Sequence, residues 1–355
     1  MRGRLSAICI AGIVITLTAG CKKQQERAGF VESAVTPRSK LADSVRLQDD
    51  TFSLLAKPIA ASRNTVGQLA IADGSDRNVK TYDSDGRRIG TIGRAGRQAG
   101  EFTHLSNAQY FGDSLFGYDF NTGTMTIFSP RTGEATRTIQ LRRPPYSIRV
   151  IDDSLLLYVR HPGQGGPLLT LARLNGRELV SFFDPQPFKN QPKLRFLSAL
   201  YADAHDGVVF AGIFGSDTLH TFDYSGKETS AAAIPSRIPL DRLEDKLAVN
   251  GEQFRRADST WFHDGIEALM GLVALDHGNV ALQIASYDSR VGTDLLRARS
   301  EILVVHSRDP GVLVSSARDD GRGLLLGRDV DGAILIASLS NDTTKSILIS
   351  RRAVP

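Results

Sequence analysis

Short apolar segments with the alternation of β-strands recur along most of the chain, separated by turns rich in glycine and aspartate. One unit repeats: a short apolar strand, a gap, a second apolar strand, a turn that ends in glycine, and a third strand. The turn residues Gly86, Gly133, Gly176 and Gly226 follow one another at intervals of 47, 43 and 50 residues. Four strands per repeat at this period are typical of a β-propeller blade, and the chain length fits six blades.

The two ends of the repeat region predict how the ring closes. The last repeat ends after three strands, around Leu324, Ile334 and Ile347, whereas Val45 to Leu55 alternates roughly and has no partner in the first repeat. We expect this segment to supply the missing outer strand of the last blade, because pairing the first strand with the last removes an exposed edge. The predicted fold class is therefore all-β, a six-bladed β-propeller with one-strand N-to-C closure, after a lipoprotein signal peptide.

The N-terminal segment has the three parts of a secretory signal. Arg2 and Arg4 precede an uncharged, mostly apolar run from Leu5 to Leu17. At about 13 residues this run is too short to span a bilayer as a helix, which takes about 20 residues. The residues that follow, Leu17-Thr18-Ala19-Gly20-Cys21, resemble the bacterial lipobox. The resemblance implies a signal peptide over residues 1–20 and a diacylglycerol, with its palmitate-type chains, on the thiol of Cys21.

Residues 21–43 are polar, charged and unpatterned, which predicts a lipidated cysteine and flexible tether before the propeller of residues 44–355. The only other cysteine, Cys9, lies in the segment to be removed, so the mature chain can form no disulfide. Lys22 stands where aspartate would direct retention, by resemblance to enteric sorting rules. In a two-membrane cell this favours the outer membrane, with the propeller facing the periplasm, over the inner membrane.

The charge balance excludes one class of partner. The net charge is +4, and removing Arg2 and Arg4 with the signal leaves +2. Basic pairs are scattered and no long basic run exists, so the chain lacks the electrostatic footprint of a nucleic-acid-binding protein.

One stretch carries a family resemblance. Gly93 to Phe102 (GRAGRQAGEF), after a strand that ends in Tyr82-Asp83-Ser84-Asp85-Gly86, resembles the crossover of NHL-type propeller repeats. The chain is also similar to six-bladed propeller lipoproteins of environmental and gut bacteria, with the best match over Leu69 to Gly133. The resemblance implies a binding or scaffold role more often than an enzyme.

The sequence contains neither the Gly-x-Ser-x-Gly motif of serine hydrolases nor a phosphate loop of the Gly-x4-Gly-Lys type. Asp83-x-Asp85-Gly86 and Asp329-x-Asp331-Gly332 lack the further ligands of a calcium loop and predict hairpin turns. His205-Asp206-Gly207 pairs an imidazole with a carboxylate, but adjacent side chains on a strand point in opposite directions. We expect a turn there rather than a relay, and we predict no catalytic residue, no metal and no cofactor.

The connectors are expected to alternate between two faces of the propeller. The short-turn face is predicted to receive Ser84–Gly86, Gly112–Asp113, Asp152–Asp153, Asn175–Gly176, Asp206–Gly207 and Ser225–Gly226. The long-loop face is predicted to receive Arg94–His104, Pro162–Pro167, Asp184–Phe196, Ser236–Gly265 and Tyr287–Arg297. Loops longer than the connection requires usually carry function, so the long-loop face is the candidate binding face.

Four residues of the long-loop face are the candidate binding residues: Arg94, Arg97, Arg195 and Trp261. Trp261 is the only tryptophan, and a loop tryptophan offers a large amphipathic contact surface. Alternatively, Trp261 pins the insertion of residues 236–265 onto the propeller rim. Helical spacing of leucines predicts that this insertion is partly helical, and it could equally be a structural lid over the channel.

Two functions remain open at this stage. The first is a membrane-anchored, exported binding or scaffold module that engages a protein or glycan of the cell envelope through the long-loop face. The second is a propeller enzyme of lactonase or lyase type with a metal in the central channel. A cluster of Asp, Glu, Asn or His side chains that converges at a channel mouth would distinguish the second from the first.

Overall fold

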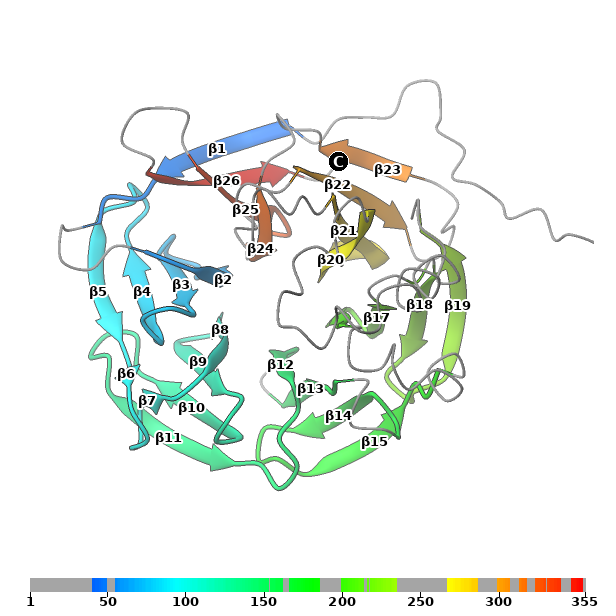
Figure 1. Cartoon of the computed structure of the whole chain (residues 1–355), viewed down its shortest axis with the longest axis horizontal. Helices are drawn as coiled ribbons and strands as arrows, with labels where there is room; N and C mark the ends of the chain where they lie inside the picture. The colour runs from blue at the N-terminus through cyan, green and yellow to red at the C-terminus, as the bar shows by residue number, and fades with distance from the viewer. Residues whose placement is uncertain are drawn as a thin grey trace, which may run out of the picture.

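The structure is a computed structural model that describes residues 40–49, 55–152, 154–161, 166–185, 199–213, 216, 218–234, 267–286, 299–306, 313–317, 323–329, 331–339 and 346–353. Over these ranges the backbone forms six four-stranded antiparallel sheets, arranged as a ring of blades (Figure 1). The predicted six-bladed β-propeller is confirmed.

Each blade runs from an inner strand to an outer strand. Blade 1 consists of β2 (Pro58–Arg63), β3 (Leu69–Asp73), β4 (Asn78–Tyr82) and β5 (Arg88–Ile92). Blade 2 consists of β8 (Leu105–Phe111), β9 (Ser114–Asp119), β10 (Thr124–Phe128) and β11 (Ala135–Gln140). Blade 3 consists of β12 (Ser147–Val150), β13 (Leu155–Val159), β14 (Leu169–Arg173) and β15 (Glu178–Phe182).

The second half of the ring repeats this order. Blade 4 consists of β16 (Leu200–His205), β17 (Val208–Ile213), β18 (Thr218–Asp223) and β19 (Glu228–Ala233). Blade 5 consists of β20 (Glu267–Ala274), β21 (Asn279–Ser286), β22 (Arg299–His306) and β23 (Leu313–Ala317). Blade 6 consists of β24 (Leu324–Arg328), β25 (Ile334–Leu339), β26 (Ile347–Ala353) and β1 (Lys40–Arg46). A short 3-10 turn, η4 (Asp276–Gly278), joins β20 to β21, and β6 (Arg94–Ala95) pairs with β7 (Glu101–Phe102) between blades 1 and 2.

One N-terminal strand closes the ring, as expected. β1 pairs antiparallel with β26 from Lys40 opposite Ala353 to Arg46 opposite Leu348, and the two strands lie side by side at the top of Figure 1. The predicted position of this strand, Val45 to Leu55, is wrong, because β1 ends at Arg46 and begins within the range expected to be tether.

The apolar residues of segment 45–55 have another role. Leu47 and Leu55 are buried in the core cluster between blades 6 and 1, where they pack with Ile71, Leu335 and others. The backbone N–H of Leu47 donates to the carbonyl of Ile347 in blade 6. The next residue, Gln48, forms an isolated β-bridge with Arg87, which precedes β5 of blade 1. These apolar positions thus belong to the crossover from the last blade to the first. Because blades 6 and 1 both bury residues of this segment, its apolar positions resemble the alternation of a strand.

The core lies between blades rather than within them. Each of the six buried apolar clusters combines residues of two neighbouring blades. Burial of one such Leu, Ile or Phe side chain contributes about 1.5–3 kcal/mol. A blade is therefore stable only with a neighbour on each side, which makes the closure of the ring a condition for a complete core.

Near the axis, neighbouring inner strands approach closely. Gly327 of β24 has no side chain, and a Cβ there would collide with the backbone carbonyl oxygen of Ala61 in β2. Elsewhere, side-chain amides bridge the blades: Gln109 Nε2 donates to the carbonyl of Val150 at 2.8 Å, and its Oε1 accepts from the N–H of Val150 at 3.1 Å. These contacts hold the ends of the inner strands in fixed positions around the axis.

Several predictions concern segments outside the described residues. The signal peptide (1–20), Cys21, most of the tether and the insertion at 236–265 belong to this group and remain predictions. In the part of the chain that the structure describes, no helix is long and apolar enough to cross a membrane.

Candidate functional site

A cavity of about 240 Å³ lies at the axis of the propeller. Its lining comes from all six inner strands, mainly from their C-terminal halves and the residues that follow. Because each inner strand ends at the turn into its second strand, the cavity lies toward the short-turn face. The charged lining residues besides His205 are Arg63, Arg149, Arg328, Asp203, Asp276 and Asp329.

Some of these charges are neutralised by each other at the junction of blades 6 and 1. Arg63 Nη1 lies 3.3 Å from Asp329 Oδ2, and Arg351 Nε donates to the same oxygen at 2.8 Å. Asp329 is buried, so the two guanidinium groups supply the positive charge that its carboxylate needs. This trio joins the closing blade to blade 1.

Other charged groups of the lining bind backbone groups between blades. Arg328 Nη1 of blade 6 donates to the carbonyl of Ala274 in blade 5 at 3.1 Å. The Asp203 carboxylate of blade 4 accepts hydrogen bonds from the N–H groups of Ala204 at 2.9 Å and Ala274 at 3.0 Å. Both side chains therefore hold the inner strands together, and the structure assigns them a positioning role.

Arg149 differs from the other cations of the cavity. It lies on β12 between Ile148 and Val150, whose side chains are buried in the core cluster between blades 2 and 3, so alternation turns Arg149 to the opposite face of blade 3. There Arg149 lines the axial cavity. Within the described residues its guanidinium has no ion pair or hydrogen bond. Five N–H donors on a group that is always charged are thus available to an anion.

Neutral polar side chains of the lining are mostly committed to the scaffold. Asn107 Nδ2 donates to the carbonyl of Ile148 at 2.5 Å, and the Gln109 amide binds Val150. Burial raises the pKa of Tyr110 to about 12, so its phenol stays protonated at neutral pH. Among the described lining residues, Arg149 is therefore the arginine that remains available to an anion.

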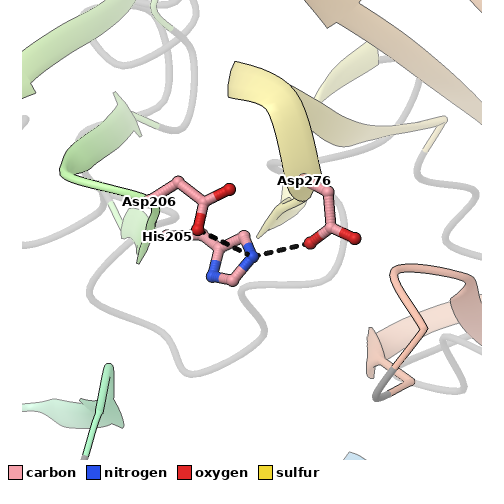
Figure 2. Close-up of side chains that lie close together, drawn as sticks. All are labelled: His205, Asp206 and Asp276. Atoms are coloured by element: carbon pink, nitrogen blue, oxygen red, sulfur yellow. Dashed lines mark hydrogen bonds and ion pairs between the residues drawn. The ribbon is translucent and has the colours of Figure 1, made fainter.

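His205 and Asp276 of the cavity lining form a cluster with the neighbouring Asp206, drawn in Figure 2. His205 Nε2 lies 2.6 Å from Asp276 Oδ1 and 3.4 Å from Asp206 Oδ1. His205 ends β16 of blade 4, whereas Asp276 lies in η4 of blade 5. The three potential ligand atoms lie within 4.8 Å of one another.

Local backbone geometry explains how neighbouring residues His205 and Asp206 approach each other. Asp206 and Gly207 have φ angles of 48° and 80°, and they connect the paired residues His205 and Val208. The predicted turn is confirmed, since two residues with positive φ form a tight hairpin connection. The expectation that the two side chains diverge was wrong, because Asp206 has left the strand and its carboxylate turns back toward the imidazole.

The predicted long-loop residues are only partly described. Arg94 lies on the exposed β6–β7 ribbon, where its Nη2 pairs with Glu101 Oε1 at 2.7 Å. The backbone N–H of Arg97 donates to Glu101 Oε2 at 2.9 Å, so both arginines are held on one ribbon. Neither lines the axial cavity. Arg195 and Trp261 lie outside the described residues, and the four-residue face remains a prediction.

Arg149 and Asp276 were not among the residues predicted from the sequence. Asp276 occupies the turn between the first and second strands of blade 5, the same turn that holds Asp206 in blade 4. Alignment of the repeats by strand order would have placed both acids at the same end of the channel. For Arg149, the alternation within β12 predicts only the face of blade 3 on which it lies, and no local signal shows that its guanidinium has no partner among the described residues.

Comparisons with known proteins give the fold and no family. No family model matches the sequence, and no curated protein matches it. A solved structure of a "Putative exported protein" from Bacteroides fragilis NCTC 9343 is 12% identical, covers 91% of this chain and 98% of its own, and has a TM-score of 0.61. A member of the DUF4221 family from Bacteroides vulgatus ATCC 8482 is 8% identical, covers 89% and 98%, and has a TM-score of 0.56. Identities this low show a shared fold alone.

Proposed function

We propose that this chain is an exported, lipid-anchored binding protein of the cell envelope that takes a small anionic ligand into the axial cavity. The observation that carries the proposal is Arg149, a cation without a partner among the described residues, in a cavity whose other arginines are paired or bound to backbone. A guanidinium without a counter-charge from the protein gives up only its hydration when an anionic ligand arrives, and it gains charge-assisted hydrogen bonds.

Export and anchoring rest on the N-terminal sequence. The basic start, the apolar run and the lipobox-like residues before Cys21 support a lipoprotein signal. The likeness to a structure described as that of an exported protein agrees with this location. An outer-membrane anchor that faces the periplasm would expose the propeller to small solutes and to protein or glycan partners there. For such a macromolecular partner, the long-loop residues Arg94, Arg97, Arg195 and Trp261 are the proposed surface.

Replacement of Arg149 by Gln should weaken anion binding by about 10- to 100-fold, because a hydrogen bond to a charged group contributes about 1.5–3 kcal/mol. The measurement is calorimetric titration of the full chain with inorganic phosphate and with succinate, in the presence of a chelator. Arg137→Gln, on the exposed strand β11, is the matched control and should bind as the wild type does.

The same titration tests the other face. A double variant, Arg94→Gln with Arg97→Gln, should leave binding of both anions unchanged. If this double variant abolishes binding while Arg149→Gln does not, the ligand belongs to the long-loop face. Equal affinities in the wild type and Arg149→Gln, or no binding of either anion, contradict the proposal.

Replacement of Cys21 by Ala should abolish labelling with radioactive palmitate and leave the protein soluble or as an uncleaved precursor. The physical reason is the loss of the thiol that receives the diacylglycerol, without which two-chain anchoring is impossible. Cys9→Ala is the control, since Cys9 lies in the removed segment, and it should be labelled normally. Palmitate incorporation into the Cys21→Ala variant at the wild-type level refutes the lipoprotein assignment.

A metal-dependent lactonase or lyase is the second candidate function. The observation in its favour is the convergence of His205, Asp206 and Asp276 at the cavity, the kind of cluster that distinguishes an enzyme from a simple binding module. Release of product from a panel of lactones by the metal-loaded protein would support it, and loss of that turnover in His205→Gln would assign it to this cluster.

A further inference from the structure

We propose that His205, Asp206 and Asp276 form a binding site for one first-row transition-metal dication of the zinc class. The site shares the axial cavity with the anion site of the proposed function, but it rests on different residues and needs no anion to exist. The three side chains come from two adjacent blades, so the ion would bridge blades 4 and 5.

The negative charges of the two carboxylates in this cluster favour a bound cation. His205 Nε2 faces a carboxylate oxygen of Asp276 at 2.6 Å and one of Asp206 at 3.4 Å. A single N–H at this nitrogen can donate fully to only one of them, and the close approach to Asp276 uses it. Within the described residues, neither carboxylate has another side-chain partner. Two negative charges therefore converge on one imidazole, and a dication at this point would neutralise both.

One separation between the ligand atoms already matches that of a coordination sphere, and all three atoms lie within 4.8 Å of one another. Ligands bound at about 2.0–2.2 Å to a single zinc ion are separated from each other by about 3.0–3.5 Å. The 3.4 Å separation between His205 and Asp206 lies in this range. The 2.6 Å separation to Asp276 is that of a hydrogen bond, and a small rotation of either side chain opens it to the ligand spacing.

Two of the ligands are held in place by the turns around them. A Cβ on Gly332, in the β24–β25 turn, would lie 2.5 Å from Asp276 Oδ2, so this turn packs directly against the carboxylate. The other oxygen, Oδ1, consequently points to His205. Asp206 is oriented by its positive φ in the hairpin turn. Preorganised ligands lose little freedom on binding, which favours an ion at this point.

The donor set selects the class of ion. Calcium takes six to eight oxygen ligands and magnesium keeps an octahedron of oxygens, whereas imidazole suits zinc and its neighbours in the first transition row. One nitrogen and two carboxylates make three protein ligands. A tetrahedral ion would then keep an open position toward the cavity, as catalytic zinc sites do and closed structural ones do not. An anion held by Arg149 in the same cavity could occupy that position.

The test is calorimetric titration of the full chain in detergent, prepared without a polyhistidine tag and stripped by a chelator that is then removed. We expect one Zn²⁺ per chain, and affinity for Ca²⁺ at least tenfold weaker. His205→Gln and Asp276→Asn should each weaken zinc binding at least tenfold. The control is His220→Gln, because among the described residues His220 Nδ1 pairs with a single carboxylate, Glu228 Oε1 at 2.7 Å. This variant should bind zinc normally.

Each outcome decides the proposal. No zinc binding, or equal zinc affinity in the wild type and both site variants, overturns it, while Ca²⁺ binding as tight as Zn²⁺ overturns the assigned class of ion. Melting curves of the metal-free variants show whether they are folded, and a folded His205→Gln that still binds zinc is the clearest contrary result. The anion titration is carried out without metal, so the zinc site and the proposed anion-binding function can fail separately. If the chain binds zinc but neither phosphate nor succinate, only the proposed function is refuted.

Discussion

Deletion of residues 40–47 should lower the melting temperature far more than deletion of residues 30–37, which removes the same length of chain. β1 pairs with β26 along the whole strand, and Leu47 is buried between blades 6 and 1. Each lost hydrogen bond costs about 1 kcal/mol, and the loss of Leu47 burial costs about 1.5–3 kcal/mol. Their sum is a large part of a typical net stability of about 5–15 kcal/mol.

The two deletions are compared by circular dichroism melting and by gel filtration. Because both retain Cys21, anchoring does not differ between them. The variant without β1 exposes the edge of β26, so it should also associate with other copies. If the two deletion variants melt at the same temperature, the N-terminal strand does not hold the ring closed.

Replacement of Lys80 by Met should destabilise the protein by about 3–5 kcal/mol, the cost of breaking a buried ion pair from one side. Lys80 Nζ lies 2.6 Å from Asp73 Oδ2 and 2.7 Å from Asp76 Oδ2, and the side chains of Lys80 and Asp73 are 0% exposed. Without the ammonium group, the Asp73 carboxylate remains buried with backbone N–H donors but no counter-charge.

Urea denaturation of three variants isolates this effect. Lys57→Met removes an exposed lysine nearby and should change the free energy of unfolding by less than about 0.5 kcal/mol. The double variant Lys80→Met with Asp73→Asn removes both buried charges and should recover part of the lost stability. A loss in Lys80→Met no greater than in Lys57→Met would show that the pair contributes nothing.

The Lys80–Asp73 ion pair makes part of the free energy of unfolding dependent on pH. Burial by itself raises the pKa of Asp73, but hydrogen bonds from Lys80 and from the N–H groups of Ala56 and Ser75 outweigh it and hold the pKa below its ordinary value. The contribution is therefore complete above the ordinary aspartate pKa and is lost as the pH falls below it, through the folded-state pKa.

The repeat architecture could be predicted from the sequence because its signals are local. Alternation of apolar residues and the glycines of tight turns depend on a few neighbouring residues, and the strands expected to begin at Leu69, Leu155 and Val208 do begin there. The need for a closing strand also followed, since three strands at the C-terminus leave an open edge.

The position of the closing strand was decided by tertiary structure. Leu47 and Leu55 are apolar because two blades, far apart in the sequence, bury them together. Alternation alone cannot distinguish a strand from a crossover that is buried on both sides. The pairing of β1 with β26 depends on where the ring brings the two ends together.

The same division applies to the candidate site. The turn at Asp206 and Gly207 is a local property and was predicted, whereas the contact of His205 with Asp276 joins residues 71 positions apart. Only the packing of blade 4 against blade 5 brings that turn beside η4. The lack of a partner for the Arg149 guanidinium among the described residues is likewise a property of the ring, because it depends on which charges of the other five inner strands are already paired. The sequence by itself determined the blades and their turns, and the closed ring determined which side chains meet at its axis.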